Sequence, residues 1–161
     1  MSLRTGRQVA TTTGVIINPN NLKLEAFYCQ DSIDRKKRLV LLYQDIRDII
    51  AKGIVVDDHE VLVEPNELVR LKDVMRINFD PMGKQVVTVS KSKVGKVSDY
   101  AVETTTMYVQ KIYASQSLLK SFTSGSLSID RNQIVEITDR KIVIQDLLES
   151  ATETEGAAVP A

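Results

Sequence analysis

The residues of this chain that could do chemistry gather mainly at one place. His59 is the only histidine, and it stands in the acidic run Asp57–Glu60. An imidazole beside carboxylates is a donor set that could hold a metal ion. The run lies between Val56 and Val61, however, where the pattern predicts a hairpin turn, and the matching turn around Asp139 adds cations instead. We therefore expect a solvated turn and no metal site.

Nucleophilic catalysis has little support in the sequence. Cys29 is the only cysteine and falls on a predicted strand, where a small buried apolar role is more typical than a reactive one. The chain has no Gly-x-Ser-x-Gly motif. The segment Gly95-Lys96-Val97 lacks the glycine spacing of a nucleotide fingerprint. We expect no enzyme, no catalytic residue and no cofactor.

Two basic groups are the remaining candidates for binding. The first is an unbroken run on the loop that leads into a predicted strand at 39–42, and the second is looser and lies in the second half of the chain. Either group could meet phosphates. Aromatic residues are only 5% of the chain, and no RNA-binding aromatic signature accompanies the charges. Solvated loops and partner-binding surfaces therefore both stay open, and the candidate partner-binding residues are Arg35, Lys36, Lys37, Arg38, Lys91, Lys93 and Lys96.

The elements that must position these residues are predicted to be short strands. Leu22, Leu24, Ala26 and Tyr28 alternate with Lys23, Glu25 and Phe27, which is the period of a strand. The same alternation recurs over 108–112, and turn clusters rich in Asn, Asp, Gly and Ser separate the runs. Many short strands in each half favour an all-β protein whose sheets close into small barrels, since closure removes exposed edges.

An internal echo suggests a duplicated domain. Gly6–Thr11 resembles Gly83–Thr88 at an offset of 77 residues. Further matches pair 46–49 with 127–130, 54–56 with 135–137 and 61–63 with 142–144, at an offset of 81. The change predicts four extra residues in the second copy, around Lys91 to Thr104. A period of this length is typical of a repeated domain and too long for a solenoid.

Short helical turns and a connection complete the predicted organisation. Pro65–Leu71 and Gln145–Leu148 are expected to close the two barrels, and 72–80 is expected to connect them. The segment 149–161 is rich in Ala, Thr and Glu and is expected to be disordered. The predicted ranges are therefore 1–76 and 81–148 for the domains and 149–161 for the tail.

The two halves resemble the PRC-barrel family. The resemblance rests on the pattern Gly-[Lys/Arg]-x-Val at Gly6 and Gly83, on the stretch Gly95–Asp99, and on the Ile/Val hairpin that follows. It covers roughly 4–76 and 81–148. It implies two tandem β-barrels without shared catalytic residues. Members of the family are modules in the photosynthetic reaction-centre H subunit, in a small-subunit ribosome maturation factor and in archaeal division-associated proteins, and these roles have docking in common.

Composition limits the possible partners. Lys and Arg number 21, as do Asp and Glu, so no global charge attracts DNA or an anionic membrane. The single cysteine favours a reducing compartment, and no apolar stretch is long enough to cross a bilayer. We therefore expect a cytoplasmic adaptor that binds a protein partner and does not insert into a membrane. The alternative is an RNA- or ribosome-associated maturation factor that uses the basic loops.

Overall fold

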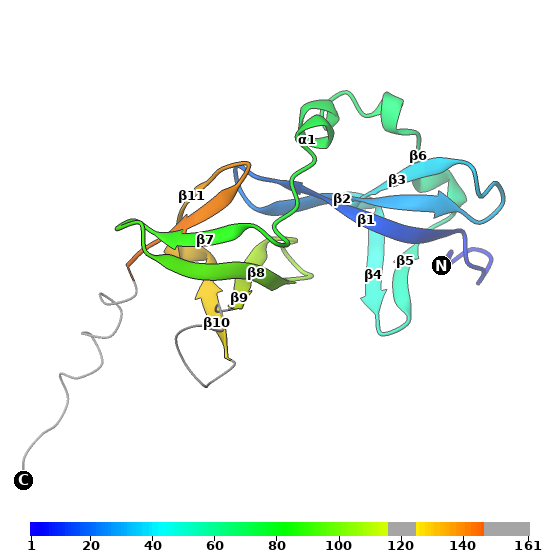
Figure 1. The fold of residues 1–161 in the computed structure, drawn as a ribbon. Helices are drawn as coiled ribbons and strands as arrows, with labels where there is room; N and C mark the ends of the chain where they lie inside the picture. Colours follow the sequence, from blue (N-terminus) through cyan, green and yellow to red (C-terminus); the bar gives the residue numbers. More distant parts are fainter. Residues whose placement is uncertain (116–124, 147–161) are drawn as a thin grey trace, which may run out of the picture. The chain divides into compact units, whose positions relative to one another are not determined.

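The computed structural model describes residues 1–115 and 125–146, and these residues form an all-β protein, as the alternation predicted (Figure 1). The strands are β1 (Ala10–Asn18), β2 (Lys23–Asp31), β3 (Arg38–Leu42), β4 (Ile46–Ile50), β5 (Gly53–Val56), β6 (Leu62–Val63), β7 (Gln85–Thr88), β8 (Lys93–Val102), β9 (Val109–Ser115), β10 (Ser126–Asp130), β11 (Ile134–Ile137) and β12 (Lys141–Ile144). Single turns of 3-10 helix lie at η1 (Tyr43–Asp45), η2 (His59–Val61), η3 (Pro65–Glu67) and η4 (Arg131–Gln133), and the described α-helix is α1 (Lys72–Ile77).

The chain divides into two compact units. The first contains Met1–Phe79 and also Val102–Tyr108, and the second contains Asp80–Ala101 and the residues from Val109 onward. The sequence placed the first boundary at 76 and gave no sign that residues 102–108 belong with the first half. These residues join it through backbone contacts, since the Leu24 N–H donates to the Met107 carbonyl over 2.7 Å. The predicted tail at 149–161 lies outside the described residues.

The first unit contains a four-stranded antiparallel sheet in the order β1-β2-β3-β6 and a separate β4–β5 hairpin. Strand β3 is buried on both faces. Leu39 and Leu41 pack with Cys29 on one side, and Val40 packs with Ala26 on the other. This explains why the run Leu39–Leu42 is apolar throughout rather than alternating.

Residues 72–79 of the segment 72–80, predicted to be a connection, belong to the first unit. Lys72–Ile77 forms helix α1, which ends where Asn78 adopts a left-handed conformation (φ 49°). Val74 and Met75 pack against the cluster of Ile16, Ala26 and Val40. Upstream, the predicted helix at Pro65–Leu71 is reduced to the single turn η3, and 147–148 of the second predicted helix lie outside the described residues.

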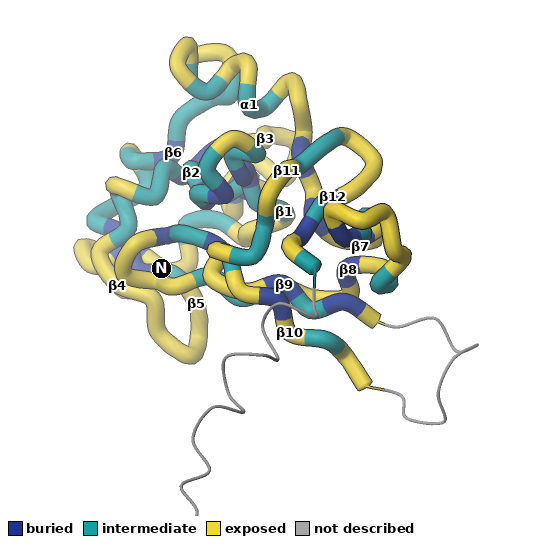
Figure 2. Tube along the Cα trace, turned by 90° about the vertical axis from the view of Figure 1, so that its left-hand side faces the viewer, coloured by how far each residue is buried: buried dark blue, intermediate teal, exposed yellow. Residues whose placement is uncertain are grey.

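The second unit is one six-stranded sheet in the order β10-β9-β8-β7-β12-β11. Strand β7 lies between two partners, antiparallel to β8 and parallel to β12. Its core includes Val86, Ile112, Ile129, Ile142 and Ile144, each at most 1% exposed. Figure 2 shows buried stretches on strands such as β7 and β9, while the connecting turns are exposed.

The strand orders of both units are open among the described residues. β1 and β6 end the first sheet, and β10 and β11 end the second. Closure of each half into a barrel therefore stays a prediction.

Similar elements occur in the two units, but not at the positions that the sequence echo matched. The 3-10 turns η1 and η4 each precede a hairpin, β4–β5 in the first unit and β11–β12 in the second. Tyr43 then corresponds to Arg131 and Ile46 to Ile134, at one offset of 88 residues. The predicted offset of 81 instead matched β4 with β10, a strand that pairs with β9.

Hydrogen bonds at the start of each unit support the new alignment. The Leu3 N–H donates to the Val56 carbonyl over 2.8 Å, and the Val89 N–H donates to the Ile144 carbonyl over 2.9 Å. Ser2 pairs with Val56 in a parallel bridge, as Thr88 pairs with Ile144. The short segment Met1–Leu3 therefore corresponds to the end of β7 and the residue after it. The echo of Gly6–Thr11 with Gly83–Thr88 is wrong, because Ala10 and Thr11 lie in β1 and pair with β2.

Candidate partner-binding site

The corrected alignment reveals a groove that is peculiar to the first unit. In the second unit the order β9-β8-β7-β12-β11 is continuous. The corresponding strands of the first unit are β2-β1 and β5-β4, and no described strand pairs with β1 on the side opposite β2. Met1–Leu3 occupies the place of only the end of β7. Among the described residues, which begin at Met1, no strand lies at the place of the first half of β7, between β1 and β5.

A cavity of about 380 Å³ lies at this place, and we call it the β1–β5 groove. Its floor is apolar and formed by Cys29, Leu41, Val56 and Leu62, members of one buried cluster. The other lining residues are Met1, Gln8, Val9, Ala10, Thr11, Thr12, Ile50, Lys52, Gly53 and Ile54. Among the side chains that line it, Lys52 is charged and no carboxylate is present.

Backbone groups of both strands point into the groove. The Ser32 N–H donates to the Val9 carbonyl, so Val9 and Thr11 face β2, and by alternation Ala10 and Thr12 face away from it. The Gln8 side-chain amide donates to the Ala10 carbonyl over 3.3 Å, in the position where a neighbouring strand would bond. On the other side, the Ile54 carbonyl accepts from the Met1 amine over 2.8 Å, so the N–H of Ile54 faces the same groove.

The exposed half of β1 carries neither charge nor proline, although the Gln8 side chain bonds to it and a bulge lies between Thr12 and Gly14. Natural proteins place Lys, Pro or a covering loop at such edges to prevent pairing with another chain. Residues 10–13 are Ala-Thr-Thr-Thr, and helix α1 packs near the other half of β1, at Ile16. A strand edge without charge or proline beside an apolar cavity is suited to binding an extended segment.

The acidic turn around His59 has a structural role. His59 Nε2 lies 3.0 Å from Oδ1 of Asp31, a side chain that is 5% exposed. The same Asp31 oxygen accepts from the Ile33 N–H, and this bond, assisted by His59, lowers the pKa of Asp31. No group of three or more possible metal-binding side chains occurs within residues 1–115 and 125–146.

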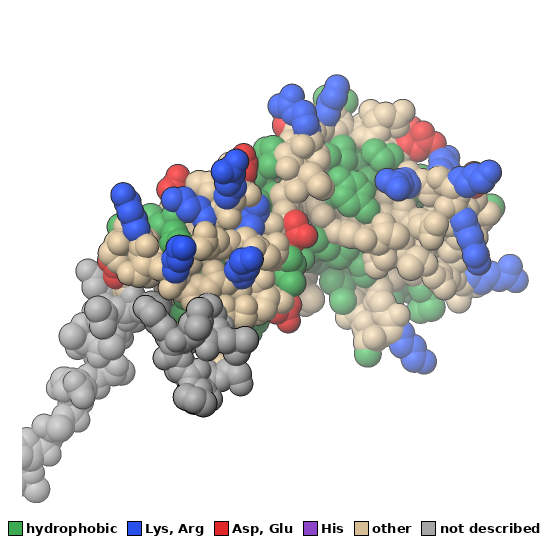
Figure 3. Space-filling model, viewed as in Figure 1, with side chains coloured by type: hydrophobic (Ala, Val, Ile, Leu, Met, Phe, Trp, Pro, Cys, Tyr) green, Lys and Arg blue, Asp and Glu red, His purple; other side chains and the backbone are tan. Residues whose placement is uncertain are grey.

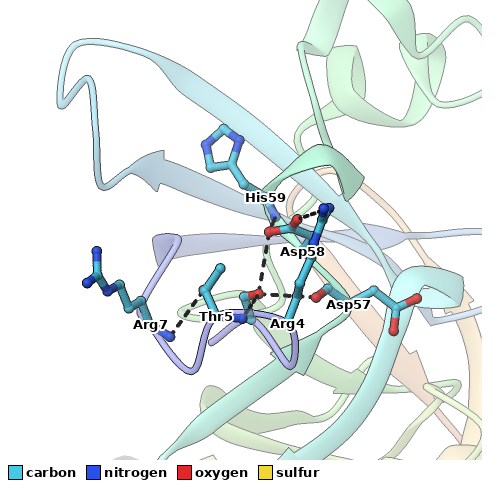
Figure 4. A network of polar contacts seen from close by, with 7 residues as sticks. Arg4, Thr5, Arg7, Asp57, Asp58 and His59 are labelled. Atoms are coloured by element: carbon cyan, nitrogen blue, oxygen red, sulfur yellow. Dashed lines mark hydrogen bonds and ion pairs between the residues drawn. The ribbon is translucent and has the colours of Figure 1, made fainter.

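Asp58 fastens the N-terminal segment to this turn (Figure 4). Its carboxylate accepts from the His59 N–H over 2.8 Å and from the Arg4 guanidinium over 3.0 Å, and these bonds, with a weaker one from Ser2, lower the pKa of Asp58. The second unit repeats the arrangement, since Ser90 donates to Asp146 and lowers the pKa of its carboxyl. The carboxylates of Asp58 and Asp146 thus stabilise the turns that follow β5 and β12.

Cys29 contributes to the groove without being poised for catalysis. It is 3% exposed, and burial raises the pKa of its thiol to about 11. A thiol with such a pKa is almost fully protonated at neutral pH and is a poor nucleophile.

The predicted basic run lies on the turn between β2 and β3, as expected, with Arg38 as the first residue of β3. Lys37 forms an ion pair with Glu64 over 2.7 Å, which raises the pKa of Lys37. All four side chains are exposed. The run does not border the β1–β5 groove.

The second basic group, Lys91, Lys93 and Lys96, lies beside Lys141, which the sequence analysis missed. Lys96 and Lys141 both pair with Gln85, and Lys93 pairs with Val87. Residues paired across strands share a face, and the intervening Val86 and Thr88 are buried, so these lysines all face outward. Lys91 lies on the β7–β8 turn in a left-handed conformation (φ 67°). Figure 3 shows Lys and Arg side chains gathered over β7 and β8.

The groove itself was missed because it depends on long-range pairing. The sequence offered one local signal, since residues 10–13 form a strand with neither charge nor proline. Which edge of that strand is free, however, follows only from the sheet order.

Comparison of the chain with protein-family models and with curated proteins finds no match. In the part of the chain that the structure describes, no helix combines the length and apolar character needed to cross a membrane.

Proposed function

We propose that this protein is a non-catalytic adaptor that binds a protein partner at the β1–β5 groove. The observation that carries the proposal is a cavity of about 380 Å³ with an apolar floor, beside a strand whose residues 10–13 carry neither charge nor proline. The polar side chains that line it are those of Gln8, Thr11, Thr12 and Lys52, and Asp31, Asp58 and His59 are engaged in holding turns elsewhere. The groove therefore supplies binding chemistry rather than acid, base or nucleophile.

Three further parts of the proposal rest on the sequence. We propose that both units are PRC-barrel-like, that each sheet closes into a barrel, and that the adaptor works in the cytoplasm. The parallel pairing of β7 with β12 and its counterpart at Ser2 and Val56 support a duplicated β-domain. The single cysteine supports a reducing compartment.

The proposal is tested by filling the groove with a larger side chain. Ala10 lines the cavity and packs against its floor, so the benzyl group of Ala10→Phe should occupy the apolar space. Thr13→Phe is the matched control, because Thr13 is an exposed residue of the same strand and does not line the cavity. Both variants and the native protein are compared in affinity capture from native cells, with quantitative identification of the proteins recovered.

The proposal expects at least one protein that is recovered with the native chain and with Thr13→Phe but is depleted about tenfold or more with Ala10→Phe, since loss of a buried apolar anchor commonly has this effect. Thermal unfolding of both variants confirms that they are folded. Identical recovery with all three chains would show that the groove is not the binding site.

A second candidate function, RNA binding, is favoured by the outward face that carries Lys93, Lys96 and Lys141. Within residues 1–115 and 125–146, no ion pair joins these lysines to a carboxylate. Like charges on adjacent strands oppose folding, so their common placement suits a polyanion such as an RNA backbone.

The RNA candidate is tested by salt titration with a single-stranded RNA. Replacing Lys93, Lys96 and Lys141 with Ser should reduce the slope of log K against log salt by about 2 if each lysine meets a phosphate. Replacing the four residues Arg35–Arg38 with Ser serves as a comparison, since that run lies on a different strand pair. An unchanged slope in the lysine variant would exclude this face as an RNA site.

A further inference from the structure

We propose that the outer face of the second unit's sheet binds single-stranded RNA, with phosphates on Lys93, Lys96 and Lys141 and an unpaired base stacked on Tyr113. The proposal rests on the second candidate function, RNA binding, and specifies which form of RNA is bound and how. It does not depend on the β1–β5 groove, whose lining residues all belong to the first unit.

A row of polar residues crosses this face from β12 to β10. Lys141 pairs with Gln85, and Gln85 pairs with Lys96. On the other side of β8, the Ser115 hydroxyl donates to the Lys96 carbonyl over 3.3 Å, and Ser115 pairs with Ser126. All of these residues are exposed. Lys, Gln and Ser are among the residues that commonly bond to the phosphates and sugars of nucleic acids, so the row suits a polynucleotide backbone.

Tyr113 adds an aromatic ring beside this row. It lies on β9 between the buried Ile112 and Ala114, so its half-buried side chain faces outward with the row. Its neighbours across the strands are Ser98, whose hydroxyl donates to the Tyr113 carbonyl over 3.2 Å, and Ser128. Both neighbours have short side chains, which favours access of a base to the ring. Cations that hold phosphates beside a ring that stacks on a base are the combination by which proteins bind single-stranded nucleic acids.

The charge of this face favours a polyanion. The three lysines form no ion pair with a carboxylate in the part of the chain that the structure describes, and Figure 3 shows Lys and Arg side chains over β7 and β8. Asp130 and Glu136 share the face but lie on the end strands β10 and β11, and Asp130 is paired with Lys111 over 3.4 Å. Positive charge is therefore concentrated over the middle strands of the sheet, where it can meet phosphates.

The ring favours an unpaired RNA strand over other polyanions. In a duplex the bases stack on one another, and their faces are not available to a side chain. An acidic protein segment would pair with the lysines but has no base to stack on Tyr113. Single-stranded RNA is therefore the ligand that uses both features of the face.

The test uses a fluorescent oligouridine of about ten nucleotides, a length within the site sizes of single-strand-binding domains, and measures its binding to the full chain by anisotropy. Tyr113→Leu keeps an apolar side chain but removes the stacking ring, so it should weaken binding about tenfold. Tyr113→Phe keeps the ring and should bind like the native protein. Thermal unfolding checks that both variants are folded. Equal affinity of the native protein and Tyr113→Leu would overturn the stacking contact.

A photochemical cross-link gives a second measurement, in the native protein. Iodouridine placed in the same oligonucleotide should cross-link to Tyr113, and mass spectrometry of the cross-linked peptide identifies the residue. Cross-linking that is confined to other residues would overturn the stacking contact, whatever the fold of the variants.

The salt dependence of binding separates the ring from the charges. Tyr113→Leu should leave the slope of log K against log salt unchanged, whereas the triple lysine variant described above should reduce the slope by about 2. The matched control replaces Arg35, Lys36 and Arg38 with Ser, which removes the same charge from the first unit, and it should leave the slope unchanged. An equal reduction in both triple variants would show that net charge governs binding and would overturn the proposal.

The outcomes distinguish RNA binding from the proposed way of binding. If the triple lysine variant lowers the slope but neither Tyr113→Leu nor cross-linking shows a contact with the ring, the face binds RNA and stacking on Tyr113 is wrong. A slope and an affinity that none of these variants changes would overturn both. Tyr113→Leu should leave the binding of an RNA duplex unchanged, and an equal loss with duplex and single strand would show that the ring does not act by stacking. If polyglutamate binds with the affinity of oligouridine, the ligand is an acidic protein segment and the RNA assignment is wrong.

Discussion

At the scale of single residues, Cys29 shows how burial alone fixes reactivity. The sequence predicted a small buried residue here, and the structure places the thiol in the core beside Leu39 and Leu41. Because the pKa of Cys29 is raised to about 11, its reaction with a disulfide reagent at pH 8 should be about a hundredfold slower in the native protein than in denaturant. A spectrophotometric thiol assay with and without guanidinium measures this ratio. Equal rates would mean that the groove opens readily to solvent.

The lowered pKa values of Asp31, Asp58 and Asp146 predict loss of stability in acid. A carboxyl whose pKa is lower in the folded than in the unfolded state stabilises the fold above its unfolded value, about 3.9, and this contribution is lost as the pH falls through the folded value. Denaturant unfolding should therefore show stability that declines below about pH 4. The Asp58→Asn variant should have a lower free energy of unfolding than the native protein at pH 7. Its free energy of unfolding should also fall by less than that of the native protein between pH 7 and pH 3.

Glu60→Gln is the control for Asp58→Asn, since Glu60 neighbours the same turn and makes none of the contacts described for Asp58. If the two variants have the same pH profile, the Asp58 contacts do not contribute to acid sensitivity.

At the scale of elements, α1 shows the limit of reading short helices from sequence. Strand alternation over Leu22–Tyr28 was clear because several consecutive residues supported it. Helix α1 spans only six residues, and its N-cap residue Leu71 makes no side-chain capping bond, so no start signal was present. What holds the helix is tertiary packing of Val74 and Met75, which local pattern does not reveal.

The packing of α1 predicts that Val74→Ala lowers the free energy of unfolding by about 1–2 kcal/mol, through lost apolar burial. Arg76→Ala is the matched control on the same helix, where the side chain is 80% exposed, and it should change stability by less than about 0.5 kcal/mol. Urea denaturation of both variants measures the difference. Equal effects would mean that α1 is only a connection, as its sequence first suggested.

At the scale of the whole molecule, composition and alternation were enough to predict an all-β protein. They were not enough to align its two units. Gly6–Thr11 and Gly83–Thr88 share a short run of common residues, yet only the second run is a strand held between two others. Strand order depends on pairing between residues far apart in the chain, and a two-residue period cannot specify it. The groove, which follows from strand order, was therefore beyond the reach of the sequence.

The segment Val102–Tyr108 gives a prediction that sequence alone could not. Met107 is 5% exposed, and its carbonyl accepts from the Leu24 N–H in the first unit. Met107→Ala should cost about 2–4 kcal/mol, as for other buried side chains cut back to Ala, and should speed hydrogen exchange at Leu24. Thr105→Ala, at an exposed position of the same segment, should do neither. Unchanged exchange at Leu24 in Met107→Ala would show that residues 102–108 do not support the first unit.

The position of Met1 has a practical consequence for how the protein is handled in the laboratory. Its amine is bonded to Ile54 at the end of a short strand that points along β5 into the apolar cavity. Any residues joined ahead of Met1 would be directed along β5 into the cavity and would compete, as a tethered segment, with a ligand there. Cys29, which lines the cavity, should therefore react more slowly with a disulfide reagent when a tag precedes Met1 than when the tag follows Ala161, and proteolytic removal of the tag should restore the rate.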